Sequence, residues 1–467
     1  MKLTAQDLLR IPHTGHQNTN RLKGTAITGV STESRTTKQG DAFLALRGEH
    51  YDAHKFVDAA FARGAVVAIV EREGVAAGDI PLVIVDDSAQ ALGSLARMYR
   101  DKFPIPVLAV GGSNGKTTTK EMVSKVLTEK YTVLSTDGNL NNHVGVPQTI
   151  FRLSSKHDIA VVELGTNHPG EIAYLCRVLG PTHALLTNIG REHLEFFGSL
   201  DGVEEEEGRL FDAVRSAKGG TAIVNADDPR VAEKAVGMKK AIHYGFTKRS
   251  SAVRGRRLAL NKTGCAAFEF TTPAMRGWRG VQLSIPGAHN AANALAAAAV
   301  GFAFKVPAGK IQRALESCQA SSRRMETMVI GGVLIINDAY NANPDSTIAA
   351  LRTLAATERK GKKIAVLGDM KELGAQAEEE HTAVGKEAAE LNIDYLLTFG
   401  SHARWIHDAA GIEGAIHYDH KNVLAEYLAE LVAPGDAVLI KGSRGMKMED
   451  IVVFLQQPGA GNHTTMQ

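Results

Sequence analysis

Cysteine and long apolar runs are both scarce in this chain of 467 residues. Its three cysteines lie far apart and lack the spacing of a metal site, so we expect reduced, packed thiols of a cytoplasmic protein; they are Cys176, Cys265 and Cys318. The most apolar long stretch, residues 291–306, is rich in alanine and too short to span a bilayer, which indicates a buried helix. Residues 1–10 lack the apolar core of a secretion signal.

A strong excess of charge of one sign is also missing. The formal net charge is +2, so composition gives no argument for a nucleic-acid partner or a membrane surface. Hydrophobic residues make up 44% of the chain and charged residues 22%, as in soluble globular proteins, and the length suggests about three domains. We therefore expect no nucleic-acid partner and no stable membrane insertion. A monomer with small-molecule partners is our further expectation, although the composition itself leaves the oligomeric state open.

What the sequence does contain is a glycine-rich stretch, Gly111-Gly112-Ser113-Asn114-Gly115-Lys116-Thr117-Thr118, between an apolar run at 107–110 and a helical pattern. Strand, glycine-rich turn and helix suit a phosphate chain, because backbone N–H groups can close around it and the helix N-terminus is electropositive. Lys116 would reach the terminal phosphates, and the hydroxyl of Thr117 would help to hold Mg²⁺. The usual pattern has a further glycine where Val110 stands, so an ordinary strand-to-helix turn is the alternative.

Two further polar residues follow predicted strands of the same region. Glu163 ends the apolar run 159–164, and His193 comes shortly after the run 184–187. The ligand crevice of an open parallel sheet lies outside the carboxyl ends of its strands, so both side chains can share a site with Lys116. Glu163 could bind Mg²⁺ directly or through water. A lone histidine is more often structural, so His193 has two open roles: structural, or in contact with metal or phosphate.

Alternating strand and helix patterns predict an α/β fold with three domains. We expect a small α/β N-terminal domain, a central parallel sheet of the P-loop ATPase type with a β extension at 248–285, and a Rossmann-like doubly wound C-terminal domain. The last domain opens with a hairpin turned at Gly331 and Gly332. The expected domain ranges are 1–103, 104–321 and 322–457, followed by a disordered tail at 458–467.

Three polar segments have both a functional and an ordinary interpretation. Ser31-Thr32-Glu33-Ser34-Arg35 collects hydroxyls beside an arginine, which suits a phosphate or sugar and equally a plain polar loop. Asn290 and Asn293 could read a base edge from successive helical turns, or Asn290 could cap that helix. The four glutamates at 204–207 are predicted to form the solvated first turn of a helix.

Loops of all three predicted domains resemble those of the Mur ligases of peptidoglycan synthesis. The phosphate loop alone would indicate only a superfamily, whereas the loops of the third domain look like one branch, which adds D-alanyl-D-alanine to UDP-N-acetylmuramoyl-tripeptide. The resemblance covers nearly the whole chain and is carried by residues 34–35, 40–41, 112–118, 138–142, 163–167, 188–198, 338–344, 368–374 and 441–446.

The resemblance implies an ATP-dependent synthesis of an amide bond, with ATP and Mg²⁺ as cofactors. In that family the substrate carboxylate attacks the γ-phosphate to give an acyl phosphate, and the amine of the dipeptide then displaces phosphate. The resemblance places Thr117 and Glu163 at one Mg²⁺ and His193 at a second. Lys116 and Arg324, the latter at the hinge between domains, would contact the phosphates.

The same resemblance implies the binding roles of the remaining residues. The nucleoside would be held by Asn290, Asn293 and Asp338. The UDP-linked peptide would face Asn139, Asn142, Thr166, Asn167 and Arg191. The dipeptide would meet loops that include Asn343 and Ser443, and the first domain, with Ser31, Ser34 and Arg35, would bind the uridine diphosphate.

The chain departs from the family pattern at residue 207. The family has a carbamylated lysine there, whose carboxylate meets the second metal, whereas this chain has Glu207, followed by Arg209 where an acid is usual. A glutamate keeps the negative charge on a shorter side chain. We hypothesise that Glu207, or its neighbour Glu206, replaces the modified lysine directly or through a bridging water, making activity independent of carbon dioxide. Milder departures are Glu33 for aspartate and Ala53 for glycine.

Two other functions are compatible with parts of the pattern. One is a related amide ligase, either the neighbouring tripeptide synthetase or folylpolyglutamate synthetase, although the loop at 340–344 argues against both. The other is a nucleotide-binding homologue that has lost catalysis, suggested by Glu207 and Arg209. The presence of all the candidate catalytic residues named above argues against that loss.

Overall fold

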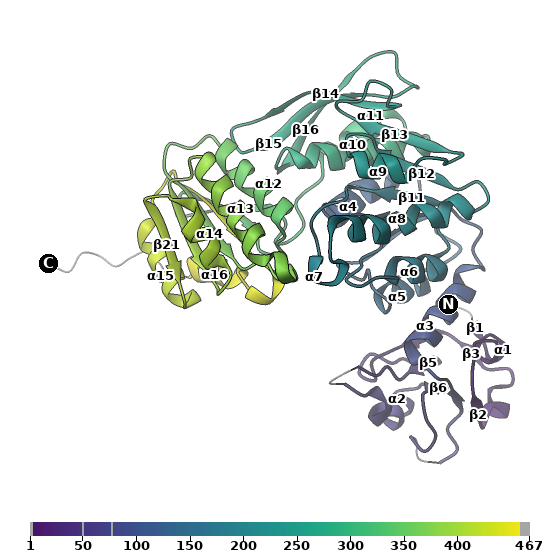
Figure 1. Cartoon of the computed structure of the whole chain (residues 1–467). Helices are drawn as coiled ribbons and strands as arrows, with labels where there is room; N and C mark the ends of the chain where they lie inside the picture. Colours follow the sequence, from purple (N-terminus) through teal and green to yellow (C-terminus); the bar gives the residue numbers. More distant parts are fainter. Residues whose placement is uncertain (1–2, 49–50, 76–77, 458–467) are drawn as a thin grey trace.

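The computed structural model describes residues 3–48, 51–75 and 78–457, so the tail expected at 458–467 lies outside the described residues. Figure 1 shows an N-terminal body in purple, a central body in blue and teal, and a C-terminal body in green and yellow. Each body has a mostly parallel sheet with helices packed against it, which confirms the predicted α/β class. None of the helices in the described ranges is long and apolar enough to cross a membrane.

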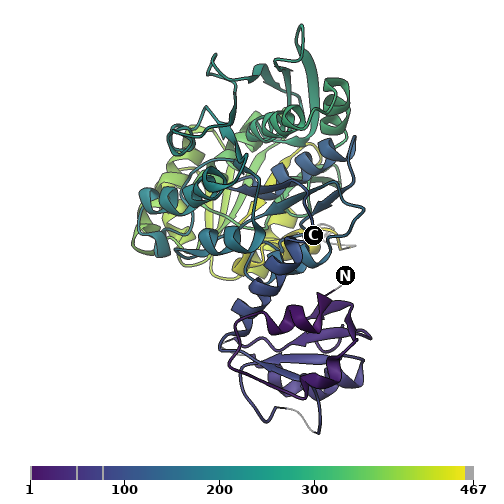
Figure 2. The ribbon, with the colours of Figure 1, turned by 90° about the vertical axis from the view of Figure 1, so that its right-hand side faces the viewer.

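The N-terminal body contains a five-stranded sheet in the order β2-β7-β6-β5-β4. Every residue of β5 and β6 is buried at its centre, and all of them except Asp41 are apolar. Figure 2 shows this body below the central one, with helix α3 running up to it. The elements are β1 (Leu3–Thr4), α1 (Ala5–Leu9), β2 (Gly15–Gln17), β3 (Ala26–Ile27), β4 (Gly29–Ser31), β5 (Asp41–Leu44), α2 (Val57–Ala62), β6 (Val67–Val70), β7 (Leu82–Ile84) and α3 (Ser88–Arg100).

Helix α3 joins the N-terminal and central bodies. Asp87 begins it by accepting a hydrogen bond from the backbone N–H of Gln90, a common N-cap arrangement. Its buried face packs against α5 (Gly145–Phe151) and α6 (Glu171–Leu179), and the hydroxyl of Tyr99 donates to the carbonyl of Leu153 at 2.8 Å. The contact fixes the N-terminal body to the outer helices of the central sheet.

The central body is built on a nine-stranded sheet in the order β16-β15-β14-β13-β12-β11-β8-β10-β9. The strands from β9 to β14 are parallel, and β15 and β16 continue the sheet antiparallel, which confirms the predicted β extension. Its other elements are β8 (Val107–Gly111), α4 (Lys116–Thr128), β9 (Val133–Ser135), β10 (Ile159–Glu163), β11 (His183–Leu186), α7 (Leu194–Phe197), α8 (Leu200–Ser216), β12 (Thr221–Asn225), α9 (Pro229–Lys234), β13 (Ala241–Gly245), β14 (Val253–Leu260), β15 (Cys265–Thr271), β16 (Arg279–Pro286), α10 (His289–Ala303) and α11 (Ala308–Glu316).

The C-terminal body has a six-stranded sheet in the order β17-β18-β22-β19-β20-β21. The predicted hairpin is confirmed: β17 and β18 pair antiparallel, and Gly331 and Gly332 turn between them with φ of 57° and 83°. The remaining strands are parallel. The elements are β17 (Glu326–Ile330), β18 (Val333–Asp338), α12 (Pro344–Ala356), β19 (Lys363–Gly368), α13 (Ala377–Glu390), β20 (Tyr395–Phe399), α14 (Ala403–Ala410), β21 (Gly414–Tyr418), α15 (Lys421–Leu431), β22 (Ala437–Lys441) and α16 (Glu449–Leu455).

Candidate active site

The glycine-rich loop connects the end of β8 to the start of α4. Gly112 has φ of 111°, and a Cβ there would lie 2.3 Å from the hydroxyl oxygen of Thr187. Gly115 has φ of 78°, and its Cβ would lie 2.7 Å from the amide oxygen of Asn293. Both positions therefore require glycine, whereas Val110 lies inside the buried strand β8, where a β-branched residue packs well.

The backbone N–H groups of the loop divide into two sets. Those of Gly112, Ser113 and Asn114 already donate to protein acceptors: the carboxylate of Glu207, and the carbonyl and amide oxygens of Asn188. The first turn of α4 instead leaves N–H groups without intrahelical acceptors, and no side chain caps them. Although the sequence predicts a cradle from Gly112 onward, the donors available for phosphate begin at the helix.

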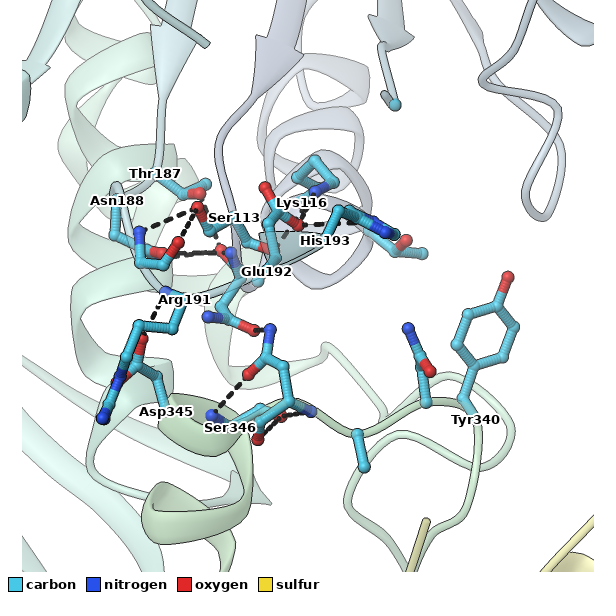
Figure 3. A pocket seen from close by; sticks show the side chains of 18 of the residues that line it. Ser113, Lys116, Thr187, Asn188, Arg191, Glu192, His193, Tyr340, Asp345 and Ser346 are labelled. Carbon is cyan, nitrogen blue, oxygen red and sulfur yellow. Dashed lines mark hydrogen bonds and ion pairs between the residues drawn. The ribbon is translucent and has the colours of Figure 1, made fainter. Parts of the chain in front are cut away.

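Lys116 extends from that first turn into a group of buried carboxylates. Its Nζ lies 3.2 Å from both Oε2 of Glu192 and the carbonyl oxygen of Ser113 (Figure 3). Burial alone would lower the pKa of Lys116, but Glu192, Glu207 and Glu163 outweigh it and raise this pKa above its ordinary value. The lysine is therefore a fixed positive charge at the helix N-terminus.

Thr117 and Glu163 meet beside Lys116. The hydroxyl of Thr117 donates to Oε1 of Glu163 at 3.1 Å, and the amide of Asn141 donates to the same oxygen at 2.8 Å. The other carboxylate oxygen of Glu163 is buried and has no partner. A hydroxyl beside a buried, unpaired carboxylate oxygen fits Mg²⁺, which binds few protein groups and keeps phosphate oxygens and water.

The described residues do not form a complete metal cage. Within residues 3–48, 51–75 and 78–457, no group of three or more His, Cys, Asp or Glu side chains is placed to hold a metal ion. The candidate metal residues Thr117, Glu163, His193 and Glu207 therefore form at most a partial set. Substrate phosphates and water must supply the rest.

The four glutamates at 204–207 do not form a solvated first turn, so that prediction is wrong. Helix α8 begins earlier, at Leu200, because the side chain of Ser199 accepts a hydrogen bond from the N–H of Gly202. The run therefore falls further along the helix, where Glu206 and Glu207 are buried. Both carboxylate oxygens of Glu206 accept hydrogen bonds from backbone N–H groups at the start of α6, at 2.8 Å from Gly170 and at 2.7 Å from Ile172. The carboxylate of Glu206 therefore has a structural role.

Glu207 lies beneath the glycine-rich loop. Its Oε2 accepts the N–H of Gly112 at 2.7 Å, and its Oε1 is buried without a partner. Burial raises the pKa of Glu207 to about 8, with Lys116 lowering it and Glu192 raising it further. Of the two candidates for the position of the modified lysine, Glu207 alone has a free oxygen.

Residues 188–198, which we call the rim loop, follow β11 and contact the C-terminal body. Nδ1 of His193 lies 2.7 Å from a carboxylate oxygen of Glu372, and the neighbouring His193 lowers the pKa of that carboxyl. The amide of Asn343 donates to the side chain of Asn114 at 2.9 Å across the same boundary. His193 therefore contacts the other body, and a metal or phosphate contact stays a prediction.

Arg191, expected to face the UDP-linked peptide, is paired with two acids of the C-terminal body. Its guanidinium lies 2.5 Å from Asp345 (Figure 3), and its backbone N–H donates to the same carboxylate at 2.7 Å. The guanidinium also lies 2.7 Å from Glu380. Burial opposes the charge of Arg191, but the two carboxylates raise its pKa. Arg191 thus holds the rim loop against the C-terminal body.

A cleft of about 1090 Å³ between the central and C-terminal bodies gathers most of the remaining candidates. Those that line it are Ser113, Asn114, Gly115, Lys116, Thr117, Thr118, Asn139, Asn142, Glu163, Thr166, Asn167, Arg191, His193, Asn290, Asn293, Arg324, Asp338, Asn343 and Ser443. Ser31, Ser34 and Arg35 lie in the N-terminal body and are not part of this cleft. Ser31 is buried in contact with Thr37, and Arg35 is exposed beside Glu33.

Asn290 and Asn293 bond to each other rather than to a helix end. The amide of Asn293 donates to Oδ1 of Asn290 at 2.9 Å, and the amide of Asn290 donates to the carbonyl of Pro286 at 2.6 Å. The residue before α10 is Ala288, and no side chain caps the helix, so the capping interpretation is wrong. Both asparagines keep a place in the cleft wall.

Several residues of the site were not singled out from the sequence, although Glu192 and Glu372 lie in segments that carry the resemblance. Glu192, which pairs with Lys116, stands next to His193 after a buried strand, so its position was a usable signal. Asp345, Glu372 and Glu380 lie on distant helices and loops, and only the fold brings them to the rim loop. Nothing in their local sequence indicates a partner in another body.

The fold and the residues of the cleft together indicate the class of enzyme to which the protein belongs. A protonated lysine at the start of a helix, a partial Mg²⁺ site and a facing α/β body are the parts of a phosphate-loop enzyme that acts on a nucleoside triphosphate between two bodies.

Three family models match the chain. They are the Mur ligase middle domain over residues 110–301, the Mur ligase glutamate ligase domain over residues 323–444, and the Mur ligase family catalytic domain over residues 26–100. These matches cover more than half of the sequence, and the chain belongs to the Mur ligase family.

Close relatives have one activity in their names. The UDP-N-acetylmuramoyl-tripeptide–D-alanyl-D-alanine ligase of Escherichia coli K12 is 38% identical over 445 residues, 94% of this chain and 96% of that protein. A crystal structure of MurF from Acinetobacter baumannii is 35% identical, with a TM-score of 0.89, and covers 97% of this chain and 99% of its own. MurF from Thermotoga maritima in complex with ADP is 30% identical, with a TM-score of 0.81, over 91% of this chain and 96% of that one.

We predict that replacing Glu207 with glutamine changes how stability depends on pH. A carboxyl whose pKa rises from 4.5 to about 8 on folding loses stability as pH rises between those values, by on the order of a few kcal/mol. Glu207→Gln can still accept the N–H of Gly112 but does not ionise, so its stability advantage should grow from about pH 5 to about pH 8 and then level off.

The measurement is the unfolding midpoint of the nucleotide-free protein across that pH range. Glu205→Gln, an exposed neighbour on the same helix, is the matched control and should follow the unsubstituted protein. Parallel pH profiles for Glu207→Gln and the unsubstituted protein would contradict the assigned burial cost.

Proposed function

We propose that this protein is the ATP-dependent ligase that adds D-alanyl-D-alanine to UDP-N-acetylmuramoyl-tripeptide in the synthesis of peptidoglycan precursors. The observation that carries the proposal is the cleft itself, where a phosphate loop faces the loops after β18, β19 and β22. Identity of 38% to a relative of that name over nearly the full length supports the same activity. ATP and Mg²⁺ are its cofactors, and ADP and phosphate are released.

The chemistry joins two substrates in sequence. The carboxylate of the tripeptide attacks the γ-phosphorus of ATP, ADP leaves, and an acyl phosphate remains. The dipeptide amine then attacks the acyl carbon, and the tetrahedral intermediate collapses with loss of phosphate and a proton. Lys116 neutralises charge on the phosphoryl group during transfer, and Arg324 contacts it from the segment between the bodies. Thr117 and Glu163 would hold Mg²⁺, which would supply further neutralisation of the phosphate charge.

The bodies divide the binding work in this proposal. The domain at 1–103 binds the uridine diphosphate, with Ser31, Ser34 and Arg35. The domain at 104–321 binds ATP and the peptide, and the domain at 322–457 receives the dipeptide. Closing the cleft aligns the amine with the acyl phosphate and excludes water, which would otherwise hydrolyse it.

The residue assignments within the cleft follow the same scheme. The nucleoside is held by Asn290, Asn293 and Asp338. The UDP-linked peptide is bound by Asn139, Asn142, Thr166 and Asn167, with Arg191 on the same wall, and the dipeptide by loops with Asn343 and Ser443. The enzyme works in the cytoplasm as a monomer, and its three cysteines, all free and buried, suit a reducing compartment.

Folylpolyglutamate synthase has a similar fold but a different activity, so it represents the main alternative to the proposed function. The Mycobacterium tuberculosis enzyme complexed with ADP has a TM-score of 0.63 but only 17% identity, so the likeness concerns the fold alone. The direct discriminator is the amine that stimulates release of phosphate. D-Alanyl-D-alanine should do so, while diaminopimelate, lysine and glutamate should not.

We predict that Lys116→Ala strongly slows ligation. Removing a preorganised charge from the transferring phosphoryl group should lower kcat by about 100-fold or more. The assay contains ATP, Mg²⁺, UDP-N-acetylmuramoyl-tripeptide and D-alanyl-D-alanine, with the product identified by mass spectrometry. Lys125→Ala, an exposed lysine on the same helix α4, is the control and should keep full activity.

Nucleotide binding by the unsubstituted protein without product from any amine would favour an inactive homologue instead. Equal activity of Lys116→Ala and Lys125→Ala would show that the phosphate loop has no part in the reaction.

We also propose that Glu207 takes the place of the carbamylated lysine of the family at the second Mg²⁺. Its buried, unpaired Oε1 supports this role, and the occupied oxygens of Glu206 argue against the neighbour. Glu207→Gln should raise the Mg²⁺ concentration for half-maximal rate by about 10-fold, on the scale of losing one charged contact. Bicarbonate should not change the rate of the unsubstituted enzyme.

Glu206→Gln serves as the comparison, because its effect should appear in stability rather than in the Mg²⁺ requirement. An unchanged Mg²⁺ requirement in Glu207→Gln, or a rate that rises with bicarbonate in the unsubstituted enzyme, would refute this role.

A further inference from the structure

The ring of Tyr340 is in contact with two guanidinium groups on the C-terminal side of the cleft. The guanidinium carbon of Arg324 is 3.8 Å from the ring centroid, and that of Arg444 is 5.7 Å from it. Tyr340 follows β18, Arg324 precedes β17, and Arg444 follows β22, so three separate segments converge on one ring. All three residues line the cleft, and Figure 3 shows Tyr340 on the loop that faces Lys116 and His193.

Neither guanidinium is neutralised by a carboxylate of the described part of the chain. Among the residues that the structure describes, no carboxylate forms an ion pair with Arg324 or Arg444. The neighbouring Arg323 differs, because it pairs with Glu449, and Arg191 pairs with two acids. An unpaired arginine in a cleft presents a planar fork that matches a carboxylate or a phosphate.

The proposed reaction brings two anions to this part of the cleft. One is the phosphoryl group, which Arg324 contacts. The other is the C-terminal carboxylate of the dipeptide, which takes no part in the chemistry and stays charged throughout. Since Arg324 is assigned to the phosphoryl group, the cleft cations of the described residues that are left without an ion pair are Arg444 and Lys371. Of these two, only the guanidinium of Arg444 can hold a carboxylate through two parallel hydrogen bonds.

The separation of the two guanidinium groups is compatible with the length of a dipeptide that reaches from one to the other. The two guanidinium carbons can be no farther apart than their combined distances to the ring centroid, about 9.5 Å. An extended dipeptide spans roughly 7 Å from amine to carboxylate. A dipeptide whose amine reaches the acyl phosphate beside Arg324 can therefore place its carboxylate at Arg444.

We propose that Arg444 binds the free C-terminal carboxylate of the incoming dipeptide, and that Tyr340 positions Arg444 relative to Arg324. The site thereby selects amine substrates that end in a carboxylate one dipeptide length from the amine. This inference rests on the proposed function and assigns it a subsite.

The test crosses an enzyme variant with a substrate variant. D-Alanyl-D-alanine is compared with its C-terminal carboxamide, using the unsubstituted enzyme and Arg444→Gln. The unsubstituted enzyme should lose about 10- to 100-fold in kcat/KM with the carboxamide, the effect of losing one charged, bidentate pair. Arg444→Gln should lose a similar factor with the acid, mostly in KM, and nothing further with the carboxamide.

The controls separate this subsite from the rest of the enzyme. KM values for ATP and the UDP-linked tripeptide should not change in Arg444→Gln. Arg444→Lys should recover part of the preference for the acid. Arg404→Gln, an exposed arginine that pairs weakly with Asp419, should behave as the unsubstituted enzyme.

Tyr340 is tested through the same substrate preference. Tyr340→Leu removes the ring and should reduce the ratio of acid to carboxamide kcat/KM, whereas Tyr340→Phe keeps the ring and should restore it. A purely structural defect would lower kcat/KM equally for the acid and the carboxamide, and the ratio of the two values would not change.

Two results would overturn the inference while the proposed function stands: equal use of acid and carboxamide by the unsubstituted enzyme, or an equal loss for both substrates in Arg444→Gln. Failure of the folded, ATP-binding enzyme to ligate D-alanyl-D-alanine at all would instead reject the proposed function, and the subsite with it.

Discussion

The site depends on a balance of buried charge beneath the phosphate loop. Lys116 lies among Glu163, Glu192 and Glu207, and a buried charge of either sign would be costly if its partners were removed. Glu192 holds the ammonium in place, and Glu207 holds the N–H of Gly112. The ammonium of Lys116 is already paired with the carboxylate of Glu192. The negatively charged phosphates of an incoming nucleotide must therefore compete with Glu192 for this ammonium.

The rim loop connects the buried charges around Lys116 to the position of the C-terminal body relative to the central body. It contributes Glu192 to Lys116, and the next residues on either side, Arg191 and His193, contact acids of the C-terminal body. The loop is therefore shared between the phosphate site and the boundary across which the second substrate must approach. A shift of the C-terminal body would be transmitted to the partner of Lys116 through adjacent residues of one loop.

Local patterns predicted the parts of the site that lie on single strand-to-helix connections. The glycine-rich loop, Glu163 at the end of β10 and the hairpin at Gly331 each follow from short-range rules. Burial of Glu206 and Glu207 did not, because the cap at Ser199 starts α8 earlier and moves the glutamates off its first turn. The pairing of Arg191 with Asp345 spans 154 residues, and no local pattern encodes it. The role of Ser31, Ser34 and Arg35 stays a prediction, since they lie outside the cleft.

The central claim is that the triphosphate held at Lys116 activates a carboxylate by phosphorylating it. Labelling the tripeptide carboxylate with ¹⁸O and analysing the released phosphate by mass spectrometry tests this claim directly. Transfer through an acyl phosphate predicts one labelled oxygen in the phosphate for every amide bond formed. Unlabelled phosphate, or release of AMP and pyrophosphate, would contradict it.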